Sequence, residues 1–323
     1  CGVYSIQLKF DGELYYSHKM DRFAFHESRY INSHIDYAEY KRSRRRFQKT
    51  WVDPGNQLSI YDHVRNNGIF EVNDGNIHLV RFELTDTYGN TSVLNFNIES
   101  KSKTIQSDKK DYIRMMSFNR ENHFRSEGIK VDFPENAFYT DIPFTYDKKT
   151  ASNGFYSNIH VVHNESTPIH KNSYLSIEVE NLEKNLQSKA LLVKVDTTSG
   201  KFYAAGGEYK NGWVSGNIRN FGNYAVAVDT VPPRIIPLSI QNNSALSESS
   251  RIRFRISDDL AGIDKIEGSL DGKWALFEYD AKSNLITHYF DSSRFELKKR
   301  HQLNLIITDY KGNATTYEAS FWK

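Results

Sequence analysis

Apolar and polar residues alternate with a period of two along most of this chain. Neighbouring side chains of a strand point to opposite faces, so this alternation predicts half-buried β-strands. Paired turn residues, such as Gly206-Gly207 and Asn211-Gly212, separate the strands and predict antiparallel hairpins. Clear examples of alternation are Gly2–Leu8, Gly128–Pro134, Tyr174–Val179, Ala190–Val195 and Gly222–Val228. The pattern predicts an all-β fold built from tandem antiparallel β-sandwiches.

An internal repeat supports this fold. Residues 78–91 read HLVRFELTDTYGNT and residues 301–314 read HQLNLIITDYKGNA, an offset of 223 residues (301 minus 78). A second match aligns residues 2–12 with 262–272, an offset of 260. Each matched pair has an alternating strand next to a tight turn. The difference of 37 residues (260 minus 223) measures an insertion in the first copy.

The second copy is complete enough to assign its strands. Short antiparallel strands at this spacing are typical of an immunoglobulin-like sandwich. Asp229 to Pro233 precedes the copy, and its two prolines suit a stiff linker between domains. The seven predicted strands are Arg234–Ile240, Arg251–Ser257, Ile263–Leu270, Trp274–Tyr279, Leu285–Phe290, Gln302–Thr308 and Thr315–Trp322.

Three domains follow from the repeat. Residues 1–99 form an immunoglobulin-like sandwich that lacks its opening strands, and we expect an upstream segment of the same protein to supply them. Residues 100–230 form a central β-sandwich, and residues 231–323 form the C-terminal immunoglobulin-like sandwich. The insertion in the first copy spans about residues 18–76.

One short helix is predicted within the insertion, between Ser33 and Gln48. Tyr37, Tyr40 and Phe47 recur near one face at helical spacing, and either Ser33 or Asp36 can cap the start. Pro54-Gly55 then predicts a turn.

Composition narrows the functional classes. The chain has 42 basic and 40 acidic residues, a balance that argues against nucleic acid and against an anionic membrane as general partners. No apolar run is long enough for a membrane-spanning helix. The single cysteine, Cys1, cannot form an internal disulfide. Cys1 is either the lipid-bearing first residue of a bacterial lipoprotein or, as we favour, an internal residue of a domain.

The strongest charge feature is the run Lys41 to Arg46, beside aromatic residues. Such a run either binds phosphates or an acidic partner, or is a solvated helix face, which we favour. If a partner binds here, the surface consists of Tyr37, Tyr40, Arg44, Arg45, Arg46 and Phe47.

Two further groups are candidates for metal binding. His160, His163 and His170 are close in sequence, but a spacing of three on a strand puts His160 and His163 on opposite faces, so we interpret them as structural. Loop carboxylates suit calcium, although carboxylates of this kind more often cap turns. These carboxylates are Asp258, Asp259, Asp86 and Asp309. No catalytic or metal-binding residue is assigned, and no cofactor is expected in this chain.

Long phrases of the sequence resemble a known family. GVYSIQLKFDG, RYINSHIDYAEYKRSRRRFQKTWVDPGNQLSIYD, FGNYAVAVDTVPPRI and ITDYKGNAT are similar to the region after the catalytic domain of lysostaphin-like (LytM-type) zinc metallopeptidases, which cleave peptidoglycan cross-links. That family binds zinc through His-x-x-x-Asp and His-x-His motifs. Neither occurs here, since His18 and Asp21 are one residue too close and no two histidines are separated by one residue.

The resemblance implies a role without a reaction in these residues. It implies a bacterial cell-envelope location, periplasmic or associated with the outer membrane, and zinc only in a peptidase domain upstream of Cys1. The chain is then an accessory, positioning region of a peptidoglycan endopeptidase, with peptidoglycan or other envelope proteins as partners. The alternative is a structural interaction scaffold in an envelope complex without peptidase activity. A third possibility, carbohydrate binding, fits the 20 Tyr, 20 Phe and 4 Trp.

Overall fold

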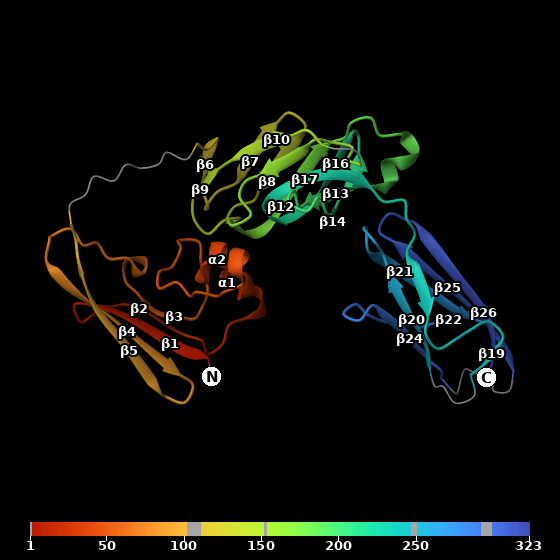
Figure 1. The fold of residues 1–323 in the computed structure, drawn as a ribbon, viewed down its shortest axis with the longest axis horizontal. Helices are drawn as coiled ribbons and strands as arrows, with labels where there is room; N and C mark the ends of the chain where they lie inside the picture. Colours follow the sequence, from red (N-terminus) through yellow and green to blue (C-terminus); the bar gives the residue numbers. More distant parts are fainter. Residues whose placement is uncertain (1, 102–110, 152–153, 247–250, 292–298) are drawn as a thin grey trace. The chain divides into compact units, whose positions relative to one another are not determined.

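The computed structural model describes residues 2–101, 111–151, 154–246, 251–291 and 299–323, and it is all-β apart from short helices (Figure 1). The chain divides into two compact units. Unit 1 comprises Cys1–Lys148, His160–Leu175 and Asn217–Gly222, and unit 2 comprises Lys149–Ile159, Ser176–Gly216 and Asn223–Lys323. The three predicted domain boundaries stay a prediction. Within the described residues, no helix has the length and apolar character needed to cross a membrane.

The N-terminal residues form one five-stranded sheet in the order β3-β2-β1-β4-β5. Its strands are β1 (Val3–Phe10), β2 (Glu13–Lys19), β3 (Tyr61–Val64), β4 (Ile77–Asp86) and β5 (Thr91–Glu99). The insertion between β2 and β4 also carries η1 (Phe25–Tyr30), α1 (Ile31–His34), α2 (Tyr37–Ser43) and η2 (Asn66–Gly68).

The central residues contribute two five-stranded sheets and one small one. Their orders are β10-β11-β17-β13-β14, β15-β16-β12-β8-β7 and β6-β9. The strands are β6 (Arg114–Met116), β7 (Asn122–Ser126), β8 (Ile129–Phe133), β9 (Ile142–Phe144), β10 (Tyr146–Lys149), β11 (Ile159–Val162), β12 (Pro168–Glu178), β13 (Ala190–Val195), β14 (Phe202–Gly206), β15 (Glu208–Lys210), β16 (Trp213–Asn220) and β17 (Gly222–Val228), with η3 (Lys184–Lys189) before β13.

The C-terminal residues form a sandwich of two sheets, β18-β20-β24-β23 and β19-β26-β25-β21-β22. In chain order these strands distribute between the sheets as those of an immunoglobulin domain do, which confirms the predicted fold class. The strands are β18 (Arg234–Pro237), β19 (Ser244–Ala245), β20 (Arg251–Ser257), β21 (Ile263–Leu270), β22 (Lys273–Ala275), β23 (Glu278–Asp280), β24 (Leu285–Tyr289), β25 (Arg300–Asp309) and β26 (Ala314–Trp322).

The internal repeat is confirmed by strand register. Strand β1 pairs with β4 through Val3 opposite Asp86, and a bulge follows before Ser5. Strand β21 pairs with β25 through Ile263 opposite Asp309, with a bulge at the equivalent place. The two offsets found in the sequence map one pairing onto the other. The N-terminal sheet is therefore the counterpart of the C-terminal sheet that contains β21, β25 and β26.

A buried histidine–aspartate contact also recurs in both copies. His78 Nδ1 lies 2.6 Å from Asp11 Oδ2, and His301 Nδ1 lies 2.7 Å from Asp271 Oδ2. Each aspartate also accepts a hydrogen bond from the backbone N–H that follows its histidine, at 2.8 Å. This contact fixes the Asp-Gly turn of each copy against the neighbouring strand.

Two sequence predictions need correction. The predicted strand Trp274–Tyr279 is two strands, β22 and β23, in different sheets, because the chain crosses between the sheets where Phe277 enters the core. The single helix predicted between Ser33 and Gln48 is also broken. Ile35 adopts extended backbone and bridges Gln48, so α1 ends before it.

The helix α2 is shorter than predicted. Asp36 caps its start by accepting a hydrogen bond from Glu39 N at 2.9 Å, whereas Ser33 lies inside α1 and caps nothing. Arg44 is left-handed, with φ of 64°, and its N–H bonds Tyr40 O, which ends the helix. Phe47 therefore does not share a helical face with Tyr37 and Tyr40.

Candidate functional site

The loop after α2 presents the predicted partner surface on a closed tip. Asp36 N donates to Phe47 O at 2.8 Å, and Lys49 N donates to His34 O at 2.8 Å. These bonds join the start of the helix to the end of the loop. The arginines between them therefore project from a fixed backbone rather than from a free tail.

Tyr40 is the aromatic centre of this tip. The guanidinium carbons of Arg44 and Arg46 each lie 5.7 Å from the centroid of its ring. Cations at this distance from a ring face are attracted to it, so the ring orders both arginines. Arg45 and Phe47 are exposed beside them. The structure thus brings together five of the six predicted surface residues, and we call this surface the arginine tip: Tyr40, Arg44, Arg45, Arg46 and Phe47.

The charges of the arginine tip are not neutralised locally. Arg42, in the last turn of α2, forms an ion pair with Glu39. In the described part of the chain, Arg44, Arg45 and Arg46 form no ion pair. Three exposed guanidinium groups without a carboxylate partner give this tip the potential to bind an anionic group.

Tyr37, the remaining predicted residue, faces a cavity of about 270 Å³ in unit 1. Trp51 and Tyr139 also line it, and Lys49 Nζ lies 5.2 Å from the Trp51 ring centroid. The Lys49 ammonium pairs with Asp53 at 2.6 Å, so its charge is already compensated. Because Tyr37 is half-buried here, it belongs to this cavity more than to the arginine tip.

The three histidines considered for metal binding are structural. Each hydrogen-bonds a hydroxyl group: His160 to Tyr146 at 2.9 Å, His163 to Thr167 at 3.1 Å and His170 to Tyr139 at 3.1 Å. Burial lowers the pKa of all three to about 4. A neutral, hydrogen-bonded imidazole is the state expected of a core histidine.

Two further histidines of unit 1 escaped the sequence analysis. His18 and His34 are buried, with ring centroids 5.0 Å apart and rings nearly perpendicular. Tyrosine hydroxyls bond both Nδ1 atoms, from Tyr16 at 3.0 Å and from Tyr61 at 3.3 Å. Burial lowers the pKa of both histidines to about 4. Their separation in sequence gave no motif that could have revealed the pair.

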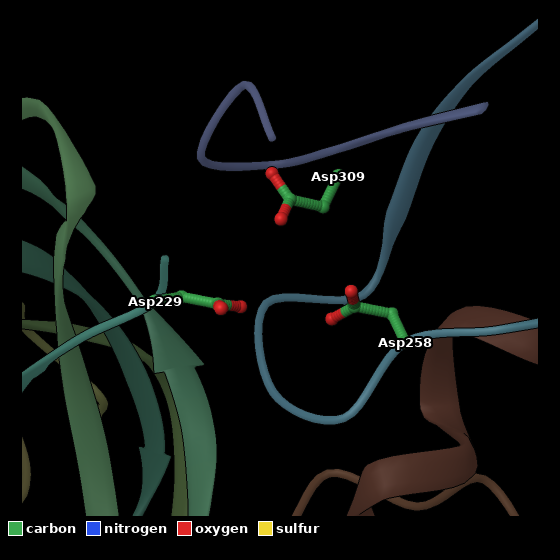
Figure 2. A group of neighbouring side chains, drawn as sticks. All are labelled: Asp229, Asp258 and Asp309. Atoms are coloured by element: carbon green, nitrogen blue, oxygen red, sulfur yellow. The ribbon is translucent and has the colours of Figure 1, made fainter. Parts of the chain in front are cut away.

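An acidic cluster lies in unit 2, where Asp229, Asp258 and Asp309 point toward one another (Figure 2). One carboxylate oxygen from each lies within 4.8 Å of the others. Asp258 and Asp309 were predicted candidates, whereas Asp229 was missed because the linker carries no periodic pattern. The other two predicted candidates do not join the cluster. Asp259 pairs with Arg234 at 3.0 Å, and Asp86 lies in the hairpin of the N-terminal sheet.

Backbone N–H groups account for most of the carboxylate oxygens in this cluster. Asp229 accepts from Val231 N at 3.0 Å and from Ala261 N at 2.7 Å. Asp258 accepts from Leu260 N at 3.1 Å and from Gly262 N at 2.7 Å. The three aspartates therefore cap turns, which is the role favoured from sequence.

Asp309 completes the capping pattern with two hydrogen bonds from its own hairpin. Its Oδ1 accepts from Lys311 N at 2.7 Å and from Asn313 N at 2.8 Å. Calcium takes six to eight oxygen ligands, and three carboxylates supply only part of such a set. Burial raises the pKa of Asp229, and the charges of Asp258 and Asp309 raise it further.

The same cluster fixes the linker to the C-terminal sandwich. Asn313 Nδ2 donates to Asp229 O at 2.9 Å, and Asp229 N donates to Lys189 O at 3.0 Å. Lys311 reaches the other way, with its Nζ donating to Gly207 O at 2.7 Å. The linker is thus held on both sides by hydrogen bonds within unit 2.

Comparisons with known proteins identify relatives of part of the chain. Residues 113–229 match the family described as a Zu5-like domain. No curated protein matches the chain. Likenesses at the level found among solved structures do not establish a function.

Three solved structures illustrate that level. The fibronectin(III)-like modules of Clostridium thermocellum CbhA show 13% identity over 46% of this chain and 84% of theirs, with a TM-score of 0.23. A 1.5-MDa bacterial ice-binding adhesin shows 11% identity over 99% of this chain and 86% of its own, with a TM-score of 0.20. The Bacteroides ovatus mixed-linkage glucan protein SGBP-B shows 10% identity over 99% and 60%, with a TM-score of 0.17.

Proposed function

We propose that this chain is a non-catalytic accessory region that positions a cell-envelope peptidoglycan endopeptidase by binding the wall or a wall-associated partner. The observation that carries the interaction role is the arginine tip, with three uncompensated guanidinium groups around Tyr40 on a closed loop. The link to a zinc endopeptidase rests on the sequence resemblance. The zinc peptidase domain would lie upstream of Cys1.

The chemistry of the tip favours an anionic partner in the bacterial envelope. Peptidoglycan carries free carboxylates on its stem peptides, and guanidinium groups bind carboxylates through paired hydrogen bonds. The exposed Phe47 adds an apolar contact next to these charges. Wall binding by such a surface would weaken at high salt because exposed charges are screened.

A wall-retention assay tests this role. The full chain is mixed with purified peptidoglycan, pelleted and measured in the pellet, beside the variant R44E/R45E/R46E. We expect at least about a tenfold loss of affinity, since that corresponds to only about 1.4 kcal/mol shared by three charges.

The matched control is K201E/K210E/K273E, which reverses three exposed lysines of unit 2. It should be retained like the parent chain. Equal retention of both triple variants would contradict the proposal. Loss in both would show only a dependence on net charge, and it would count against the tip as well.

A second candidate function is a structural scaffold in an envelope protein complex, without any peptidase. The exposed apolar strand β5 favours it, because four of its residues or neighbours offer apolar surface to another protein. The sequence encoded upstream separates the two candidates. A domain with His-x-x-x-Asp and His-x-His motifs would support the endopeptidase, and a domain without them would support the scaffold.

An upstream segment that completes the N-terminal sheet is part of either proposal. In both cases the protein is exported to the periplasm or the outer membrane, and its partners are envelope proteins or peptidoglycan rather than nucleic acid. Adhesin and glycan-binding structures are among those compared above, which agrees with an exported interaction region.

A further inference from the structure

The N-terminal sheet has an uncovered apolar face beside an uncovered edge. We call this the β5 face and define it by four side chains: Phe82 and Leu84 on β4, and Leu94 and Phe96 on β5. Leu94 is 56% exposed and Phe96 is 41% exposed. The pairing of Phe82 with Leu94 places all four residues on the same side of the sheet.

The C-terminal copy shows what covers the equivalent face. An offset of 223 residues converts Phe82 to Leu305 and Leu94 to Tyr317, and Leu305 is fully buried. Strand β20 lies against this position, with the Phe254 ring 5.0 Å from the Tyr317 ring in an edge-to-face contact. A second sheet therefore buries in one copy the surface that the other copy exposes.

The insertion of the first copy does not replace that second sheet completely. Val52 and Phe70 pack against the small core formed by Leu8, Tyr16 and Val80. This cluster covers the half of the sheet nearest β2. Leu94 and Phe96, at the other side of the sheet, remain outside it.

The edge of β5 is also uncovered. In the C-terminal copy, β19 pairs in parallel with β26, and Leu246 N donates to Trp322 O at 2.8 Å. In the described residues of the N-terminal sheet, β5 is the last strand. Its nine residues contain no lysine, arginine or proline, the residues that commonly block pairing at an edge.

We propose that the β5 face binds an extended segment with alternating apolar side chains, which adds in parallel along β5 and covers Leu94 and Phe96. By equivalence with Ser320 and Trp322, the outward backbone groups that would pair with it are those of Asn97 and Glu99. The β5 face shares no residue with the arginine tip. Failure of either proposal would therefore leave the other standing.

Hydrogen exchange with a synthetic peptide tests this inference. The probe has the sequence of residues 239–257, which includes β19 and β20, the strands that cover the equivalent face in the second copy. Added in excess to the full chain, it should slow exchange at the β5 amides of Asn97 and Glu99. The variant L94K/F96K should bind at least about tenfold more weakly, because it removes most of the apolar contact.

The control is V93K, which places a lysine on the opposite face of the same strand, where Val93 is 47% exposed. It should bind the peptide like the parent chain, and the thermal melts of both variants should match the parent. Unchanged exchange at β5 in excess peptide would overturn the inference. Equal binding by L94K/F96K would overturn it too, as would a dimer of the chain alone that L94K/F96K abolishes, because the occupant would then be a second copy.

Discussion

The two related copies at the ends of this chain use the same strand register and bury very different amounts of it. In the C-terminal copy, Leu303, Leu305 and Ile307 of β25 are fully buried between two sheets. In the N-terminal copy, only Val80 among the equivalent β4 residues is buried. A strand's register is set locally by its turns and bulges, whereas its burial depends on whether a second layer is present.

The largest expected contrast comes from truncating equivalent side chains in the two copies. Leu305→Ala should lower the free energy of unfolding by about 2–5 kcal/mol, since it leaves a cavity in a closed core. Phe82→Ala, at the equivalent position, should cost less than half as much because its side chain is already partly solvated. Denaturant titration of both variants measures the difference. Equal losses would show that the N-terminal face is covered in solution.

Acidification should separate the copies next. The pKa of His18 and His34 is lowered to about 4, so below pH 6.5 the unfolded chain binds protons that the folded chain excludes. Stability is thus lost as pH falls from about 6.5 to 4, by up to about 3 kcal/mol for each histidine.

Asp229 of unit 2 has the opposite sign. Its raised pKa favours the protonated, folded form, so its contribution improves as pH falls. Hydrogen exchange at pH 7 and pH 5 should show selective loss of protection around β2 and α1. Uniform loss throughout the chain would contradict this assignment, and His34→Gln should reduce the pH dependence if it holds.

A smaller effect is expected where the copies differ by one side chain. Gly268 of β21 takes the place of Leu8, and a Cβ added at Gly268 would lie 2.3 Å from the Phe277 ring. Gly268→Ala should therefore destabilise the chain by about 1–3 kcal/mol through overpacking. Thermal melts of G268A and of G268A/F277L measure this. The second substitution should recover part of the loss, and a melt of G268A equal to the parent's would contradict it.

The smallest effect concerns the histidine–aspartate contact of the first copy. Hydrogen bonds to Asp11 and then to Asp74 raise the pKa of His78. Its stabilising effect is complete below the ordinary histidine pKa near 6.5 and is lost as pH rises through the raised value. Asp11→Asn should move the pKa of His78 back toward 6.5 in an NMR titration. An unchanged titration would assign the shift to Asp74 alone.

Local patterns made much of the fold predictable. Thr-Asp and Gly-Asn at fixed spacing revealed the hairpins that contain Asp86 and Asp309, and their alignment predicted the shared register. The crossover at Phe277 was not predictable in this way, because an apolar residue between two short strands reads like part of one strand. The sequence also hid the fact that the insertion stands where the second copy has β23 and β24.

The candidate sites were only partly predictable for a different reason. The arginine run was visible in the sequence, but its geometry depends on the left-handed Arg44 and the bridge between Ile35 and Gln48. Asp229 and the pair of His18 and His34 depend on contacts between distant segments. Periodicity reports which face a side chain occupies, and it does not report what lies opposite that face.

The linker contacts of Asp229 have a mechanical consequence. A pull on the C-terminal end of the chain would reach the central residues through a junction where Asp229 is bonded to Lys189, Val231, Ala261 and Asn313. Several bonds would then share the load, and the junction would resist small forces like a stiff joint and yield abruptly at a threshold. An envelope protein that must hold its distance from the wall under turgor and shear would gain reach from such a joint without gaining slack.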